Sequence, residues 1–322
     1  MVDKDIRVGV IGVGHLGEYH VQKYRSMKGV ELIGVVDIDA DRAAEISQRY
    51  STTIYGSLDE LLKRVDAVSL AVPTESHFAV AKEILTAGVH LLIEKPITYD
   101  QDDADRLIHM AQENGLALQV GHVERFNPAV VKMESLLKQP IFVESHRMNL
   151  FTTRGTDVDV VLDLMIHDLD IILHMARSEV REVHAVGMSV ITEKTDIANV
   201  RIIFQNGMVA NLTASRVSNQ PLRKIRIFQP DAYISVNCFK KEISVTRLDD
   251  VSRTEPLPQI VSNKMNYPDA DPLFDQLSAF TYAVRTGTEP VVTGRDGRAA
   301  LKIALAIIDQ IEKGCRNFQS LC

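Results

Sequence analysis

A glycine-rich turn near the start of the chain constrains the fold more than any other feature. The turn follows the apolar run IRVGVIG and opens a stretch with helical periodicity, which is the context that the pattern G-x-G-x-x-G requires. Its residues are Gly12, Val13, Gly14, His15, Leu16 and Gly17. The first glycine permits a tight turn, the second lets the backbone approach a pyrophosphate, and the third lets the helix pack against the sheet. We therefore expect a dinucleotide to bind at the N-terminus of this helix.

The choice between NAD and NADP is indicated by an acidic residue at the end of the next apolar run. This run, ELIGVVD, ends at Asp37, about 20 residues after the third glycine. A carboxylate there accepts hydrogen bonds from ribose hydroxyls and repels a 2′-phosphate, which favours NAD. Arg42 lies close enough in the sequence to leave NADP open. A turn that binds no nucleotide is the alternative, and the spacing and Asp37 disfavour it.

Residues 6–120 alternate short apolar runs with stretches of helical periodicity. The runs are rich in β-branched residues and unbroken by polar alternation, as in strands buried on both faces. Helices are expected over residues 15–27, 40–50, 58–64, 75–87 and 100–114. Alternation of this kind predicts an α/β fold in which residues 1–121 form a Rossmann domain with a doubly wound parallel sheet.

The second half of the chain has a different pattern of predicted helices and strands. One long helix is predicted over 158–176, and it is followed by alternating runs with the hairpin signal Asn206-Gly207 between two of them. Residues 122–322 are therefore expected to form a second α/β domain with an open, mainly antiparallel sheet. The proline-rich residues 254–272 are predicted to be a loop. Helices are expected over 271–285 and 295–313, the last of them packing back on the first domain.

Composition excludes several classes of protein. The chain has 322 residues, 45% of them hydrophobic and 25% charged, which is typical of an ordinary globular protein of about two domains. A formal charge of −7 disfavours a nucleic-acid partner. Three scattered cysteines fit a reducing cytoplasm, and no signal peptide or membrane-spanning run is apparent. We expect a cytoplasmic protein that binds neither nucleic acid nor membranes.

Candidate chemistry lies where the predicted parallel strands end, because ligands of open α/β sheets bind there. The first such end carries Pro73 and Thr74, with His77 in the following helix. The next carries Glu94 and Lys95. Desolvation at the end of an apolar strand favours the neutral form of a lysine and hence acid–base work. The alternative is a surface lysine whose head reaches water.

The helix predicted over 158–176 carries a narrow polar stripe. Asp163, His167, Asp170 and His174 fall at i, i+4, i+7 and i+11, a pattern that predicts a helix lining a wet cleft. A hydrogen bond from the His167 imidazole to Asp163 would fix the tautomer of the ring and prepare it for proton transfer. A solvated stripe without chemistry and a metal site are the alternatives. We expect no metal, because oxidation of an alcohol by NAD does not need one.

These motifs together resemble the glucose–fructose oxidoreductase/inositol dehydrogenase (Gfo/Idh/MocA) family of NAD(P)-dependent dehydrogenases. The likeness covers nearly the whole chain and rests on segments 9–20, 71–77, 93–96, 121–128 and 163–170 and on the closing helices. It implies that Lys95 is the catalytic lysine that binds the oxidised hydroxyl, that His167 is its proton-transfer partner, and that Asp163 orients substrate or histidine. A cis Lys95–Pro96 bond is also implied. The implied cofactor residues are Gly12, Gly14, His15, Leu16, Gly17, Asp37, Arg42, Pro73, Thr74, His77, Glu94 and Lys95.

Within the family, GHVERFNPAV and the segment around RGTDVDVV resemble sugar-nucleotide members that oxidise the 3-hydroxyl of UDP-N-acetylglucosamine. The implied substrate residues are Lys95, Arg125, Asn127, Arg154, Asp163 and His167. For Arg125, Asn127 and Arg154, surface salt bridging is the alternative. Met165 stands where the family often has glycine, which puts the sugar identity in question.

The resemblance also implies partners and leaves two other functions open. It implies a homodimer or homotetramer built through the C-terminal sheet, and an aminotransferase that uses the ketone on the route to amide-linked lipid A. A dehydrogenase of a free sugar, inositol or another polyol is the alternative enzyme. A non-catalytic nucleotide-sensing regulator is the alternative of another class, and the intact set Lys95, Asp163 and His167 disfavours it.

Overall fold

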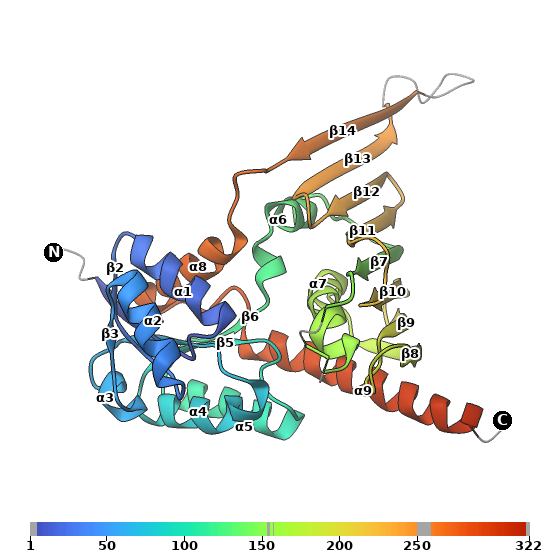
Figure 1. The fold of residues 1–322 in the computed structure, drawn as a ribbon. Helices are drawn as coiled ribbons and strands as arrows, with labels where there is room; N and C mark the ends of the chain where they lie inside the picture. Colours follow the sequence, from blue (N-terminus) through green and yellow to red (C-terminus); the bar gives the residue numbers. More distant parts are fainter. Residues whose placement is uncertain (1–4, 153–154, 157, 250–258, 320–322) are drawn as a thin grey trace. The chain divides into compact units, whose positions relative to one another are not determined.

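The chain forms two compact units in a computed structural model that describes residues 5–152, 155–156, 158–249 and 259–319 (Figure 1). The first unit is Met1–Val123 with Asp271–Leu301, and the second is Glu124–Ala270 with Lys302–Cys322. The sequence assigned everything after residue 121 to one domain. The structure instead groups α8 (Pro272–Thr286) with the first unit, because its Leu277 and Phe280 are fully buried in the core of that unit.

The first unit contains a six-stranded sheet in the order β3-β2-β1-β4-β5-β6, and every pair in it is parallel. The strands are β1 (Ile6–Ile11), β2 (Val30–Val36), β3 (Thr53–Ile54), β4 (Ala67–Leu70), β5 (His90–Glu94) and β6 (Leu118–Gly121). Because the order reverses between β1 and β4, the crevice for a ligand lies outside the carboxyl ends of these strands. The predicted doubly wound parallel sheet is confirmed.

Helices cover both faces of this sheet (Figure 1). They are α1 (His15–Ser26), α2 (Ala40–Tyr50), α3 (Leu58–Leu62), α4 (Thr74–Thr86), α5 (Gln101–Glu113) and α8. Val8, Val10 and Leu92 on the strands have no exposed surface, as expected of strands that are buried on both sides. The polar groups of the site therefore lie at strand ends and not within the strands.

The second unit contains an eight-stranded sheet in the order β14-β13-β12-β11-β7-β10-β9-β8. Its strands are β7 (Phe142–Met148), β8 (Val180–Met188), β9 (Ile197–Phe204), β10 (Val209–Ser215), β11 (Leu222–Gln229), β12 (Ala232–Asn237), β13 (Glu242–Leu248) and β14 (Ile260–Asn266). Only β7 and β10 pair in parallel, so the sheet is mixed and mostly antiparallel. The hairpin at Asn206-Gly207 is confirmed, with Gly207 at φ +88°.

Two strands of this sheet lie where the sequence indicated none. The sequence predicted a loop throughout 254–272, which is wrong for β14, because its residues complete a ladder with β13. β7 carries the polar residues Glu144, His146 and Arg147, yet it lies between β11 and β10. In both cases the neighbouring strand supplies the hydrogen bonds. The sequence pattern within a segment does not predict which neighbour it will pair with.

The segment predicted as one α-helix over 158–176 begins instead with a π-helical turn, Val161–Met165, that leads into α7 (Ile166–Ala176). Turns of this kind are rare in proteins, and those that occur often lie at functional sites. The turn carries Asp163, and α7 carries His167. α7 is followed by Arg177, which has the left-handed conformation with φ +46°.

The closing helix α9 (Gly294–Gln319) contributes to both units. Its residues to Leu301 group with the first unit and those from Lys302 with the second. In the second unit Gln310 accepts a hydrogen bond from the Ala185 N–H (3.0 Å) and donates one to the Val183 carbonyl (2.7 Å) on β8. Over the described ranges, no helix is both long enough and apolar enough to span a bilayer.

Candidate functional site

The glycine-rich turn between β1 and α1 requires its first and third glycines. Gly12 has φ +79°, and a Cβ there would lie 2.7 Å from the Ala71 carbonyl oxygen. A Cβ on Gly17 would lie 1.8 Å from the carbonyl oxygen of Gly12. A Cβ on Gly14 would meet nothing within 4 Å, and Gly14, His15 and Leu16 are exposed. The turn is therefore packed on its inner side and open on the side where a pyrophosphate would approach the N-terminus of α1.

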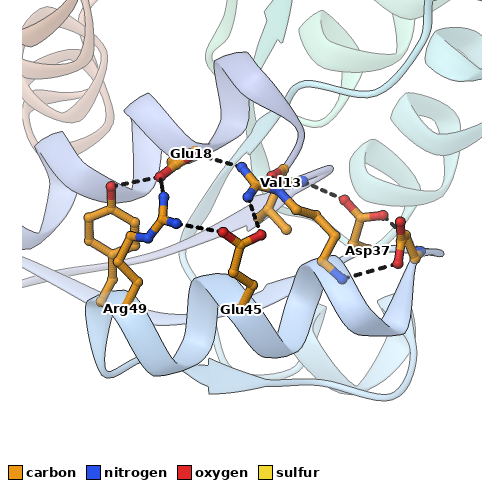
Figure 2. Close-up of polar contacts among 8 residues, drawn as sticks. Val13, Glu18, Asp37, Glu45 and Arg49 are labelled. Atoms are coloured by element: carbon orange, nitrogen blue, oxygen red, sulfur yellow. Dashed lines mark hydrogen bonds and ion pairs between the residues drawn. The ribbon is translucent and has the colours of Figure 1, made fainter.

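Asp37 lies at the end of β2 and is fixed against this turn (Figure 2). Its Oδ2 accepts a hydrogen bond from the Val13 N–H at 2.6 Å, and its Oδ1 accepts one from the Asp39 N–H at 2.9 Å. Arg42 on α2 donates from Nε to the carbonyl oxygen of the same Val13 at 2.9 Å. The structure thus brings Asp37, Arg42 and the turn together, and these residues fit the ribose and pyrophosphate of a dinucleotide.

His77 lies between the backbone carbonyls that follow two neighbouring strands. Its Nδ1 is 2.9 Å from the Pro96 oxygen and its Nε2 is 3.0 Å from the Val72 oxygen. Burial lowers the pKa of His77, so the ring is neutral and donates one hydrogen bond at a time. Only 1% of the residue is exposed. His77 therefore supports the turn after β5, whereas the sequence suggested a coenzyme contact.

Lys95 follows β5 and is half-buried, and its peptide bond to Pro96 is cis, as the resemblance implied. Glu94 before it is 7% exposed, and its Oε1 lies 3.2 Å from Nε2 of the buried His20 on α1. Pro73, which is exposed, and Thr74, which is half-buried, begin α4 at the neighbouring strand end. All these residues share the carboxyl edge of the parallel sheet.

Asp163 and His167 belong to the second unit. Both are half-buried, whereas Leu164, Met165 and Ile166 between them are buried. The Asp163 N–H donates to the carbonyl of Asp159, which precedes the π-helical turn, at 2.9 Å. A Cβ on Gly155 would lie 3.3 Å from Oδ2 of Asp163, so the loop before the turn passes close to this carboxylate. Met165, the departure from the family pattern, has no exposed surface.

The other half of the polar stripe anchors α7. Arg125 has a side chain that is 3% exposed, and its guanidinium lies 3.3 Å from Asp170 Oδ1 and 2.9 Å from His174 Nδ1. It also lies 3.8 Å from Glu134 on α6 (Pro128–Glu134). Arg125 is thus an interior residue that holds α7 and α6, which differs from the substrate contact suggested by the sequence.

Asn127 is also an interior residue, at 2% exposure. Its Oδ1 accepts the Ala129 N–H and so caps α6, while its Nδ2 donates to Glu124 at 3.1 Å and to the Cys238 carbonyl at 2.9 Å. Such a role is structural. Arg154, the third expected phosphate ligand, lies outside the described residues. Within the part of the chain that the structure covers, no group of three or more His, Cys, Asp or Glu side chains is arranged to hold a metal ion.

The sequence did not indicate Glu18 or His20, both on α1. Glu18 contacts Arg42 and Arg49 on α2, and His20 contacts Glu94 at the end of β5. These partners are far away in the sequence and meet only because the helix and the strands pack together. A charged or imidazole side chain on a helix gives no local sign of such a partner.

The parallel sheet, the glycine-rich turn and Asp37 define a dinucleotide-binding domain of the Rossmann class. The chain belongs to the Gfo/Idh/MocA family of NAD-binding oxidoreductases. Residues 6–122 match the model described as "Oxidoreductase family, NAD-binding Rossmann fold", and residues 129–235 match the "GFO/IDH/MocA C-terminal domain". The family resemblance, the oxidoreductase class and the NAD(P) cofactor expected from the sequence are thereby confirmed.

Two relatives place the chain within this family. It is 40% identical to UDP-N-acetylglucosamine 3-dehydrogenase of Acidithiobacillus ferrooxidans over 95% of this chain and 97% of that protein. A solved structure of that enzyme superposes with a TM-score of 0.91 at 39% identity, covering 96% and 98% of the two chains. Myo-inositol 2-dehydrogenase of Thermotoga maritima is 24% identical over 96% and 97%.

Proposed function

We propose that this protein oxidises the 3-hydroxyl of UDP-N-acetylglucosamine to a ketone with NAD as the oxidant. The observation that carries the proposal is 40% identity over 97% of the length of a relative with that name. The residues that the reaction needs, Lys95, Asp163 and His167, are all present in this chain. The myo-inositol relative at 24% identity supports a polyol dehydrogenase as the second candidate.

The chain's own residues have separate tasks in the proposed reaction. NAD, when bound, takes up the hydride from the sugar carbon. Lys95 holds the reacting hydroxyl, and His167 accepts its proton while Asp163 keeps the imidazole in the required tautomer. The half-buried positions of Asp163 and His167 on one face of the π-helical turn and α7 support this division. His77 supports the turn after β5 and so fixes the position of the Lys95 backbone.

A panel of substrates tests the proposal. The protein is mixed with NAD and with UDP-N-acetylglucosamine, other UDP-sugars, free sugars or inositols, and the absorbance of the reduced coenzyme is followed. We expect turnover with UDP-N-acetylglucosamine, and NMR of the product is expected to place the ketone at C3. Turnover with inositols alone would select the second candidate, and no turnover with any UDP-sugar would refute the substrate.

The role of Lys95 is tested separately. Lys95→Met is expected to lose about 10²–10⁴-fold in turnover, the usual contribution of a positioned acid–base group, while it binds NAD as the native protein does. Lys82→Met removes the same charge from an exposed position of α4 and is expected to retain activity. Near-normal turnover of Lys95→Met would remove Lys95 from the mechanism.

The wider setting of the enzyme belongs to the same proposal. We place it in the cytoplasm as a homodimer or homotetramer formed through the eight-stranded sheet, supplying its ketone to an aminotransferase on the route to amide-linked lipid A. A ketone at a sugar-ring carbon is the functional group that an aminotransferase converts to an amine. Sedimentation of the purified protein tests the assembly, and a coupled assay with an aminotransferase and an amino donor tests the next step.

A further inference from the structure

Five side chains form a cross-helix network beside Asp37 (Figure 2). This coenzyme-side network joins α1 to α2 and consists of Glu18, Arg42, Glu45, Arg49 and Tyr50. Arg42 Nη2 lies 2.5 Å from Glu18 Oε2, and Arg42 Nη1 lies 2.6 Å from Glu45 Oε2. Arg49 contacts the other oxygen of each carboxylate, and the Tyr50 hydroxyl donates to Glu18 at 3.0 Å. Two carboxylates thus balance two guanidiniums.

Arg42 is held next to the position that decides between NAD and NADP. Its Nε binds the carbonyl of Val13, and Asp37 binds the N–H of the same residue. A 2′-phosphate on the ribose that Asp37 faces would lie within the neighbourhood of this guanidinium. Arginine is the side chain that suits phosphate best, because its fork of donors matches the phosphate oxygens.

The three nitrogens of the Arg42 guanidinium are already engaged, by Val13, Glu45 and Glu18. Glu18 is the firmer of the two carboxylate partners, because its side chain is 19% exposed and that of Glu45 is 48% exposed. Burial acts to raise the pKa of Glu18, but hydrogen bonds from Arg42, Tyr50 and Arg49 hold it below its ordinary value, so Glu18 stays charged.

We infer that Glu18 sets the coenzyme preference of this enzyme by occupying Arg42, which would otherwise accept the 2′-phosphate of NADP. Asp37 repels that phosphate directly, and Glu18 acts through Arg42 as a positioning residue. If the network were only a brace between α1 and α2, removing Glu18 would change stability and would affect NAD and NADP alike.

The test measures dissociation constants of NAD and NADP by isothermal titration calorimetry on the full chain. It uses no sugar, so its outcome is separate from that of the proposed substrate. In an Asp37→Ser background, which removes the direct repulsion, Glu18→Gln is expected to tighten NADP about tenfold, as one charge-assisted contact would, and to change NAD less than about twofold. Arg42→Gln added to this pair is expected to abolish the gain.

A matched control separates the contact from the change in net charge. Glu83→Gln removes one negative charge from an exposed position of α4 and is expected to leave the NADP constant of Asp37→Ser unchanged. If the gain is absent, is equal for both coenzymes, survives Arg42→Gln or is reproduced by Glu83→Gln, the inference is overturned. If the double variant does not fold, Glu18→Asp in the same background shortens the reach to Arg42 and is expected to give a smaller gain for NADP, and no gain would overturn the inference as well.

Discussion

Two networks of carboxylates and arginines in this protein differ in burial and therefore in what they contribute to stability and to ligand binding. Among the four charged residues of the coenzyme-side network, the side-chain exposure runs from 19% at Glu18 to 49% at Arg49. The interior network of the second unit consists of Glu124, Arg147 and Asp168, and their side chains are 3–10% exposed. Arg147 lies on β7, 2.9 Å from Glu124 and 2.6 Å from Asp168 at the start of α7.

Exposure decides what each network does. Water and salt screen the coenzyme-side pairs, so they contribute little to stability, and their geometry is available for selecting a ligand. Burial acts to raise the pKa of Glu124, yet Arg147 holds it below its ordinary value, so the buried carboxylate stays charged. If Arg147 is lost, the only cation left beside this carboxylate among the described residues is Arg223, which is 36% exposed and 3.7 Å away. The interior network therefore fixes the segment that carries His167, whereas the other tunes coenzyme binding.

The largest expected effect comes from opening the interior network. Arg147→Met keeps most of the volume but removes the buried cation between Glu124 and Asp168 and leaves Glu124 only the more distant Arg223, so the free energy of unfolding is expected to fall by about 3–5 kcal/mol. Urea denaturation measures it. Arg226→Met is the control, because its side chain is 36% exposed beside Glu144, and it is expected to cost less than about 1 kcal/mol. Equal costs for the two variants would contradict the comparison.

Asp196 extends the comparison, because it is a buried carboxylate that is bound mainly by backbone N–H groups. Asp196 has no exposed surface; burial acts to raise its pKa, but the N–H groups of Ile191, Thr192 and Val190 lower it to about 2. A carboxyl whose pKa is lower in the folded than in the unfolded state stabilises the fold at any pH above its unfolded pKa. This stabilisation is lost as the pH falls through the folded pKa.

Asp196→Asn is therefore expected to lower the free energy of unfolding by about 2 kcal/mol at neutral pH. The difference from the native protein is expected to shrink between about pH 4 and pH 2, the interval that separates the unfolded and folded pKa values. Denaturation across this range measures it. Asp231→Asn, at a carboxylate that is 34% exposed beside Lys138, serves as the control with a smaller effect. A difference independent of pH would argue against this account.

A smaller effect is expected from opening the coenzyme-side network. Glu18→Gln is expected to lower the free energy of unfolding by less than about 1 kcal/mol, because its ion pairs are screened, and the difference is expected to shrink as salt is raised. Denaturation at low and high ionic strength measures both. A cost as large as that of Arg147→Met would show that this network holds the fold as the interior one does.

The smallest effect is expected at Arg49, where half of the side chain is in solvent. Arg49→Ala leaves the contact between Arg42 and Glu18 in place, so neither the urea midpoint nor the NADP constant is expected to change measurably. Calorimetry and denaturation of the single variant check this. Tighter NADP binding by Arg49→Ala would assign the preference to the whole network and not to Glu18.

The sequence alone determined the class of the first unit, the glycine-rich turn, Asp37 and the position of Lys95 after a buried strand. These features depend on short windows, because the period of apolar residues and the φ requirement of a glycine are local properties. The family and the expected roles of the catalytic residues were predicted from the resemblance to known proteins, because the periodicity of the sequence alone does not specify them.

Only the tertiary structure decided which polar residues have partners inside the protein. Arg125 and Asn127 were candidates for substrate binding, and both are buried in the second unit because Asp170 on α7 and Glu124 meet them there. β7 became a strand through ladders with the distant β10 and β11, β14 through its ladder with the preceding strand β13, and Leu277 of α8 joined the core of the first unit. The contact between Glu18 and Arg42 has the same origin. Such contacts join residues that are distant along the chain, and packing selects them by shape and charge, which no local period encodes.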